Sequence, residues 1–550
     1  MTRQVDVLIA GGGPCGLVLA IELGRRGVRV LLVNDQLETA FNPQANATQA
    51  RTMEHFRRLG FADEIRALGL PPDYPTDIAY CTRYTGFELA RFKLPSAKDA
   101  KKVVTQLNGA WSAAELPHRV SQKFVEKCLY QKASELPSVE LRYGTRLRHF
   151  EDVGDHVTAT IEDLQSGGIE AVSSAYLVGA DGPRSMVRQQ MGWRYEGEGG
   201  IPRDFMGGRM YAIYLRAPTL YERCPHPPAW MNVTFNTERR AFMAAVDGVQ
   251  EFAFHTQLKP GEDESTLTDA DAKALFYEAV GAEIPIEILA RRGWTAGHCL
   301  VASVFQQARV FIAGDAAHLF TPTGGLGYNT AVEDAVNLGW KLAAVLKGYA
   351  AESVLETYGL ERKPAAVRNT NYARGFADSL GLFVPDPSIE ATNPTGEEVR
   401  AIAGAYLEAH GRAEFNIPGV TFGTRYDDSP LVLSRGESPP PDQANHYEQT
   451  AIPGGRAPHL WLPDGTSIYD HFGFDWTLIH FGLQQGEVAE WSEQAQALGL
   501  PLHLYRSDSA EAKTLYDADW ALIRPDQVVA ARGAGDASPA QVLSNLLGHV

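Results

Sequence analysis

Two glycine-rich segments, far apart in the chain, have the residue types that hold an electron-rich ligand. The first is Gly-Gly-Gly-Pro-Cys-Gly at 11–16, and the second is Pro-Thr-Gly-Gly-Leu-Gly-Tyr-Asn at 322–329. Glycine allows the backbone to approach a ligand closely, and the free amides at a helix start bind phosphates and other electron-rich groups. A single dinucleotide site needs one such segment. The presence of two therefore predicts one large cofactor that contacts both.

The first segment lies in a predicted strand–helix–strand unit. Apolar runs predict strands over 5–10 and 28–33, and an amphipathic pattern between them predicts a helix. In the dinucleotide-binding fingerprint the first glycine makes the tight turn, the second lets a pyrophosphate approach, and the third allows close helix packing. Proline suits the first helical turn, where an amide proton is dispensable. The predicted cofactor contacts here are Gly11, Gly13, Pro14, Cys15 and Gly16.

Asn34 occupies the position where this fingerprint normally has an acidic residue that binds the ribose hydroxyls. An asparagine side chain still hydrogen-bonds a diol, but it carries no charge. Asp35 is next in sequence, yet successive strand side chains point to opposite faces, so it cannot simply replace Asn34. We therefore expect Asn34 to contact the adenosine part of the cofactor, with an altered affinity.

The second segment follows a predicted strand over 309–313, which enters Gly314 and Asp315. A helix is predicted beyond it, because apolar residues recur there at helical spacing. Thr330 and Glu333 have the spacing of a capping box, which predicts that the helix starts there. Backbone amides near this start would face the cofactor, and they belong to Gly327, Tyr328 and Asn329.

Composition and charge exclude several classes of protein. A chain of 550 residues exceeds one hydrophobic core, so two or three domains are expected. Its net charge of −17 disfavours nucleic acid and anionic lipid as partners, and no apolar stretch predicts a signal peptide or a membrane span. Five scattered cysteines without a CxxC pair predict a cytoplasmic protein. No GxSxG or HExxH motif is present, so neither a hydrolase nor a zinc enzyme is predicted, and no metal is expected.

A third segment, LVGADGPRSMVR at 177–188, places an Asp-Gly pair between a predicted strand and a helix. Together the three segments resemble the class A flavoprotein monooxygenases, the single-component aromatic hydroxylases that include para-hydroxybenzoate, phenol and chlorophenol hydroxylases. The resemblance covers nearly the whole chain. It implies an α/β fold in which a Rossmann-like FAD-binding domain is interleaved with an antiparallel-sheet substrate domain and followed by a thioredoxin-like domain.

The resemblance also implies a role in FAD binding for each segment. The first would hold the diphosphate, Gly314 and Asp315 would bind the ribityl chain, and 322–329 would border the isoalloxazine ring. Asp181 and Gly182 would shape a site that serves both FAD and the pyridine nucleotide. Two further matches to family residues near the flavin are Arg51 and Gln122, although an ordinary exposed glutamine is the alternative for the latter.

In that family NADH or NADPH reduces FAD, O2 adds at flavin C4a, and the resulting hydroperoxide transfers an oxygen atom to an electron-rich ring. The resemblance thus implies an aromatic hydroxylase with tight non-covalent FAD, transient NAD(P)H, O2 and a small aromatic substrate such as a phenol. The backbone of Pro322, Gly325 and Gly327 would help to keep water from the intermediate. Baeyer–Villiger oxygenation or epoxidation of a polycyclic, antibiotic-like substrate is one alternative, and a non-catalytic flavin or ligand carrier is another.

Alternating apolar residues between 192 and 302 predict an antiparallel sheet that would form the substrate pocket. Its candidate substrate residues are Tyr211, Tyr214, Phe235 and His255. For each of them core packing is the alternative, because alternation does not say which face meets the flavin.

The predicted C-terminal domain contains no cysteine, which excludes thiol redox chemistry there and leaves packing or homodimer contact as its role. A Pro- and Ser-rich stretch precedes it and is predicted to be a linker. The predicted FAD-binding domain comprises 1–80, 106–190 and 303–375, the substrate domain 81–105 and 191–302, a helical segment 376–425, the linker 426–453, and the thioredoxin-like domain 454–550.

Overall fold

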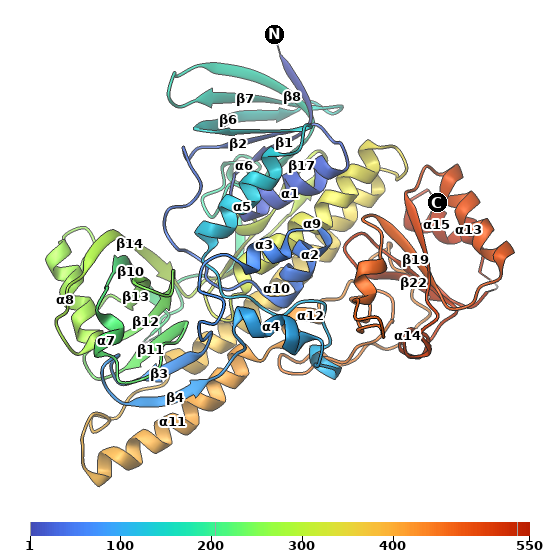
Figure 1. The fold of residues 1–550 in the computed structure, drawn as a ribbon. Helices are drawn as coiled ribbons and strands as arrows, with labels where there is room; N and C mark the ends of the chain where they lie inside the picture. Colours follow the sequence, from blue (N-terminus) through green and yellow to red (C-terminus); the bar gives the residue numbers. More distant parts are fainter. Residues whose placement is uncertain (1, 204, 536, 550) are drawn as a thin grey trace.

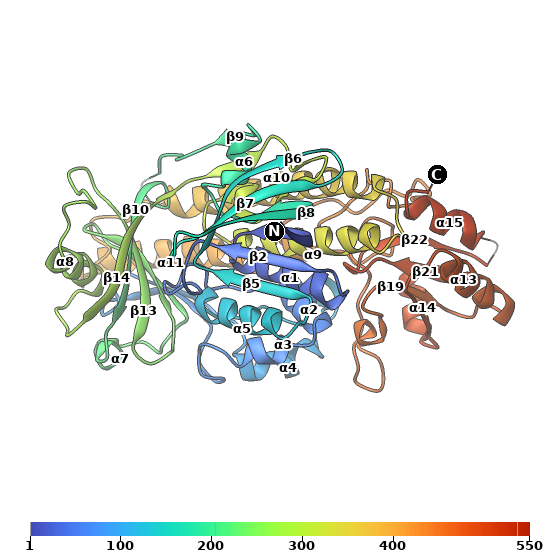
Figure 2. The same ribbon diagram turned by 90° about the horizontal axis from the view of Figure 1, so that it is seen from above.

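The computed structural model describes residues 2–203, 205–535 and 537–549. Three parts lie in a row in both views: an antiparallel sheet at one end, a central α/β part, and a C-terminal part at the other end (Figures 1 and 2). The antiparallel sheet and the C-terminal part therefore lie on opposite sides of the central part.

The central sheet is largely parallel. Its strand order is β16 (Gln306–Gln307), β17 (Val310–Ile312), β8 (Ile169–Gly179), β1 (Arg3–Ala10), β2 (Val30–Asn34) and β5 (Val139–Tyr143). All pairs from β17 to β5 are parallel, and an antiparallel hairpin of β6 (Thr145–Asp152) and β7 (Val157–Asp163) extends from β8. Apolar runs such as β2 form buried strands here, as expected for a parallel sheet. This is the predicted Rossmann-like arrangement.

The strand register brings the three predicted motifs to one edge of this sheet. Ala10 at the end of β1 pairs with Val33 of β2 and with Gly179 of β8, and Ile312 of β17 also pairs with Gly179. The glycine turn, the Asp-Gly pair and the Gly-Asp pair follow these strands directly. Open α/β sheets bind their ligands at this carboxyl edge.

Two long helices begin at this edge, α1 (Pro14–Arg25) and α9 (Leu326–Leu346), and they pack against each other. The predicted start of α9 at Thr330 is wrong. Gly325 is its N-cap and adopts a left-handed conformation with φ +65°, which glycine tolerates readily. The amides of 326–329 therefore lie in the first turn, where they have no acceptor within the helix.

Among the described residues the second sheet has seven strands, and it is antiparallel except for the parallel pair of β3 and β11. Their order is β14 (Glu287–Ala296), β10 (Gly208–Arg216), β13 (Glu251–Gln257), β12 (Arg240–Ala245), β11 (Met231–Phe235), β3 (Ile78–Cys81) and β4 (Glu88–Phe92). Helix α8 (Asp269–Val280) covers one face, where the rings of Phe254 and Phe276 lie 5.3 Å apart. The sheet differs slightly from the predicted ranges, since β3 begins at Ile78. In addition β9 (Tyr195–Glu198), β15 (Cys299–Ala302) and β18 (His318–Phe320) form a small sheet of their own.

The C-terminal part has the strand order β20 (Leu502–Arg506), β19 (Trp476–His480), β21 (Trp520–Ile523) and β22 (Val529–Gly533). Strands β19 and β20 are parallel, and the other pairs are antiparallel. Its helices are α13 (Gln485–Ala497), α14 (Ala510–Tyr516) and α15 (Pro539–Leu546). This βαβαββα order agrees with the thioredoxin-like arrangement that the resemblance implies.

Three helices connect the central and C-terminal parts: α10 (Ser353–Gly381), α11 (Pro394–Phe415) and α12 (Pro418–Phe422). Helix α10 continues past the predicted boundary at 375, and α11 runs along β3 and β4 of the antiparallel sheet (Figure 1). The range 426–453, all of it described, contains no named helix or strand.

Candidate active site

The three motifs are in direct contact at the carboxyl edge of the central sheet. The Gly11 amide donates to the Val33 carbonyl (2.8 Å), and the Ala180 amide donates to the Ala10 carbonyl (2.7 Å). A Cβ atom on Gly11 would lie 2.0 Å from the Ala180 carbonyl oxygen, and Gly11 has φ +112°. Only glycine fits this position. Segments distant in sequence therefore form one continuous backbone surface.

This surface fits a nucleotide cofactor. No described atom lies within 4 Å of the place where a Cβ on Gly13 would be, so its backbone is open to a phosphate group. Asp315 is exposed although buried residues flank it. Several buried polar side-chain atoms near the edge have no hydrogen-bond partner in the described structure, and they are Asn46 Oδ1, Thr48 Oγ1, Ser121 Oγ, Asp181 Oδ1 and Tyr328 OH. Such unpaired groups are costly unless a ligand satisfies them.

Asn34 uses one end of its amide within the protein. Its Oδ1 accepts a hydrogen bond from the Gly12 amide (3.1 Å), and the Tyr143 hydroxyl donates to the Gly12 carbonyl (2.6 Å). The Nδ2 donor is the end that remains for a ribose hydroxyl. The usual acidic side chain would instead offer a charged acceptor.

A buried asparagine and glutamine position the second glycine segment. Asn329 Nδ2 donates to the Ala47 carbonyl (3.0 Å), and its Oδ1 accepts from the Gln49 amide (2.8 Å). Gln49 Nε2 in turn donates to the Gly324 carbonyl (2.6 Å). The Asn329 side chain therefore ties the start of α9 to the 47–49 segment, and only its backbone remains to face a cofactor. Sequence reasoning missed Gln49, because no motif marks it.

Asp334 on α9 holds the Gly314-Asp315 loop in place through its side-chain hydrogen bonds. Its carboxylate accepts from the Gly314 amide (3.1 Å), from His318 Nε2 (2.6 Å) and from Arg362 Nε (2.8 Å). Burial would raise the pKa of Asp334, but the charges of His318 and Arg362 lower it below its ordinary value. The group therefore stays ionised and holds the loop that carries Asp315.

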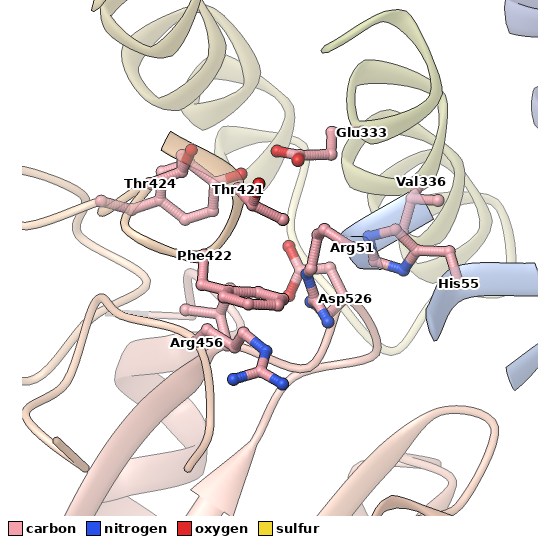
Figure 3. A pocket seen from close by; sticks show the side chains of 11 residues that line it. Arg51, His55, Glu333, Val336, Thr421, Phe422, Thr424, Arg456 and Asp526 are labelled. Atoms are coloured by element: carbon pink, nitrogen blue, oxygen red, sulfur yellow. The ribbon is translucent and has the colours of Figure 1, made fainter. Parts of the chain in front are cut away.

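Arg51 does not serve the role that the resemblance implies. Its guanidinium donates to Gln527 Oε1 (2.7 Å) and to the Asp526 carbonyl (2.5 Å) of the C-terminal part, and it pairs with Glu54. Figure 3 shows it beside Asp526 on a cavity between the two parts. That cavity, of about 20 Å³, has room for water but not for a cofactor. The prediction of a flavin contact for Arg51 is corrected, because its donors are already satisfied elsewhere.

Gln122 is half-buried at the start of α5 (Gln122–Ser134). Its Nε2 donates to Glu126 (2.6 Å), and its backbone amide donates to the Ala45 carbonyl (2.7 Å). The side-chain oxygen is the atom left for a flavin contact, which stays a prediction.

The antiparallel sheet presents one face to the central part. Tyr80, Val233, Phe242 and His255 form one register row across it, so their side chains share a face. Tyr211 lies on the other face, with α8, and accepts a hydrogen bond from Arg291 (2.8 Å). The substrate role predicted for Tyr211 is therefore corrected to core packing.

His255 and Tyr214 share the face toward the central part, but they differ in their partners. Tyr214 is buried and engaged, because its hydroxyl accepts from Lys123 Nζ (2.6 Å) and hydrogen-bonds Glu251. His255 stacks on Phe242 (4.5 Å between ring centroids) and meets Trp294 edge-on (5.8 Å). Its Nδ1 and the Trp294 Nε1 have no partner among the described residues. Burial lowers the pKa of His255 to about 4, so it is neutral at pH 7.

Comparison with known proteins agrees with this geometry. The chain matches a family model described as FAD binding domain over residues 4–373, and one described as aromatic-ring hydroxylase, C-terminal, over residues 450–550. A putative polyketide hydroxylase of Streptomyces halstedii is 30% identical and spans 100% of this chain and 96% of its own. Phenol 2-monooxygenase of Pseudomonas sp. (strain EST1001) is 29% identical over 85% of this chain and 77% of its own. The solved structure of chromopyrrolic acid-soaked RebC with bound 7-carboxy-K252c has a TM-score of 0.88 at 32% identity and covers 100% of both chains.

The chain therefore belongs to the class A flavin-dependent monooxygenases, as its three motifs predicted. It is an FAD-dependent aromatic monooxygenase that uses NAD(P)H and O2, which sets aside the non-catalytic carrier. No helix in the described part of the chain is long and apolar enough to span a bilayer.

Proposed function

We propose that the protein hydroxylates a phenolic or similarly electron-rich aromatic ring. The observation that supports this most is the aromatic face of the antiparallel sheet, which lies toward the motif-bearing part. Along it, neighbouring ring centroids are 4.5–6.5 Å apart, within the range of packed rings, and the rings are those of Tyr80, Phe235, Phe205, Phe242, His255 and Trp294. A flat aromatic substrate matches such a face.

FAD would be held by the Gly11–Gly16 turn, Asp181, Asp315 and the amides of 326–329, and it supplies hydride acceptance and oxygen transfer when bound. The residues of the chain itself bind FAD and orient it. The amides at the start of α9 favour negative charge on a reduced flavin. Gln49 and Asn329 hold these amides in place through the hydrogen bonds described above. Burial along the aromatic face excludes water.

A substrate of several fused rings is a second candidate, favoured by the continuity of that aromatic face. The named relatives include a polyketide hydroxylase as well as a phenol monooxygenase. Ring hydroxylation is distinguished from Baeyer–Villiger oxygenation by the product structure and not by mass alone, since both add one oxygen atom.

The test is a panel of phenol, 2,4-dichlorophenol, 1-naphthol and a hydroxyanthraquinone, offered to the yellow holoenzyme with NADH or NADPH. We expect at least one compound to stimulate NAD(P)H oxidation and to gain one oxygen atom on the ring, shown by mass spectrometry and NMR. Release of hydrogen peroxide alone with every compound would contradict the proposal, and a ring-expanded lactone would replace it.

A further inference from the structure

A small cavity lies where α2 (Ala50–Arg58), α9 and α12 meet the C-terminal part. Its volume of about 20 Å³ is enough for about one or two water molecules or for one small ion. Figure 3 shows the side chains of Thr421 and Thr424 on one side of it and that of Arg456 on the other. Among the described residues that line it, none belongs to the three motifs, so the cavity is distinct from the candidate active site.

Several side chains of the cavity wall have a buried polar atom without a hydrogen-bond partner among the described residues. These atoms are Arg456 Nη1, Thr421 Oγ1, Thr424 Oγ1 and His55 Nδ1. Arg456 holds the Glu54 carboxylate through Nε (3.1 Å) and Nη2 (2.6 Å), which leaves Nη1 over. A guanidinium nitrogen only donates, and a hydroxyl donates readily. Because unpaired buried donors are costly, this wall indicates a bound group that accepts several hydrogen bonds at once.

The carboxylates on the cavity wall already have cationic partners. The Asp526 carboxylate accepts from Arg524 Nη2 (2.6 Å) and Nε (3.1 Å), and Glu333 accepts from Arg362 Nη1 (3.2 Å). Each carboxylate is thus neutralised by an arginine, so the cavity offers no net negative charge to a cation.

Arginine charges dominate the electrostatics around His55, which is 1% exposed at the cavity. Burial lowers the pKa of His55 well below its ordinary value. The charges that act in the same direction are those of Arg51, Arg58, Arg362 and Arg456. The His55 ring is therefore neutral at pH 7, and the positive charges around it favour an anion over a neutral molecule of the same size.

We propose that this cavity binds one chloride ion, which fastens the C-terminal part to the FAD-binding part. Arg456 Nη1 and the hydroxyls of Thr421 and Thr424 donate hydrogen bonds to the ion. Arg456 belongs to the C-terminal part and Thr421 to α12, while α2 closes the cavity with His55. The volume admits a single-atom anion and excludes phosphate, sulfate and carboxylic acids. The proposal does not depend on which ring the enzyme hydroxylates.

The experiment compares the thermal unfolding midpoint of the FAD-loaded enzyme in potassium chloride and in potassium gluconate at equal ionic strength. Gluconate is also monovalent, but it is too large for the cavity. A ligand that binds only the folded state raises stability with its concentration, so the midpoint should rise with chloride and not with gluconate. Thr421→Val keeps the shape of the side chain but removes the hydroxyl. It should raise the chloride concentration needed for a given stabilisation at least about tenfold, whereas Thr421→Ser should respond as the wild type does.

The matched control is Thr514→Val, at an exposed threonine on α14 whose hydroxyl donates to the Ala510 carbonyl (2.9 Å). Its response to chloride should equal that of the wild type. Crystals of the wild-type holoenzyme grown in bromide locate the ion directly, because bromide replaces chloride and scatters anomalously, and a peak should lie between Thr421 and Arg456.

Equal midpoints in chloride and gluconate would overturn the proposal, and so would an unchanged chloride response in Thr421→Val. Water alone in the cavity of the bromide crystals would overturn it as well, and a bromide peak without any effect in solution would show binding at crystal concentration only. If Thr421→Val folds poorly, the bromide crystals and the comparison of the two salts, both on the wild type, decide the question.

Discussion

The Glu361 cluster of the C-terminal interface and the Asp181 carboxylate of the cofactor edge are both buried, but they differ in how completely their oxygens are paired. At the interface the Glu361 carboxylate is fully buried and is contacted by Lys341 (2.6 Å), Arg524 (2.8 Å), Asn337 (2.6 Å) and Ser429 (2.6 Å). At the cofactor edge atoms such as Asp181 Oδ1 and Thr48 Oγ1 have no partner in the described structure.

This difference separates a permanent contact from a ligand site. Buried charges are stable only when they are paired, so the paired Glu361 carboxylate favours a contact that stays closed. Unpaired buried groups are tolerated where a ligand completes them. We therefore expect the C-terminal part to act as a structural clamp on α9 and α10. At the cofactor edge the unpaired buried groups are left for a bound ligand. Homodimer formation stays a prediction.

Disrupting the Glu361 cluster at the C-terminal interface should have the largest effect on stability. Glu361→Gln leaves Lys341 buried without its counter-charge and leaves Arg524 with Asp526 alone, and removal of one partner of a buried pair costs about 3–5 kcal/mol. We expect a large fall in the midpoint of thermal unfolding and faster proteolytic release of the C-terminal part. Glu408→Gln is the control, because its partner Arg412 is 64% exposed and the pair is worth about 0.5 kcal/mol or less. Equal midpoints for the two variants would refute the clamp.

Gly13→Ala should damage the cofactor edge without damaging the fold. Gly13 has φ −75°, which any residue adopts, and a Cβ there meets no described atom within 4 Å. The added methyl would occupy the space of the phosphate, so FAD affinity should fall at least about tenfold, or about 1.4 kcal/mol. Fluorescence titration with FAD and thermal unfolding without FAD measure the two effects. Gly11→Ala, which is strained at φ +112°, should lower both. A stability loss in Gly13→Ala would show that the position is structural.

His255→Gln should change how stability depends on pH. On the substrate side the His255 Nδ1 also lacks a partner among the described residues. The folded-state pKa of His255 is lowered to about 4, below its ordinary value of about 6.5. Between these values the unfolded chain binds more protons, so the stability contributed by the neutral ring is lost as the pH falls. We expect the wild type to lose up to about 1.4 kcal/mol more per pH unit than the variant over this range. Urea midpoints at several pH values measure this, and parallel curves would contradict it.

Asn34→Asp should have the smallest effect of these variants. Asp keeps the acceptor for the Gly12 amide and replaces the Nδ2 donor by a charged acceptor for a ribose hydroxyl. Because a charged hydrogen bond exceeds a neutral one by about 1 kcal/mol, we expect FAD to bind about fivefold more tightly. Titration of FAD fluorescence measures the change. Tyr143→Phe, which removes the other hydrogen bond to Gly12, is the companion variant and should weaken binding. Unchanged affinity in Asn34→Asp would mean that this side chain does not reach the ribose.

The cofactor class and the strands that carry the three motifs follow from the order of the residues alone. Those signals are local, because a tight glycine turn after an apolar strand constrains the backbone wherever it occurs. Which residues face the ligand depends on contacts that form only in the folded chain. Arg51 turns to the C-terminal part and Tyr211 to α8, because their partners Asp526 and Arg291 lie far away in sequence. Gln49 carries no motif, since its role arises only from contacts between distant segments.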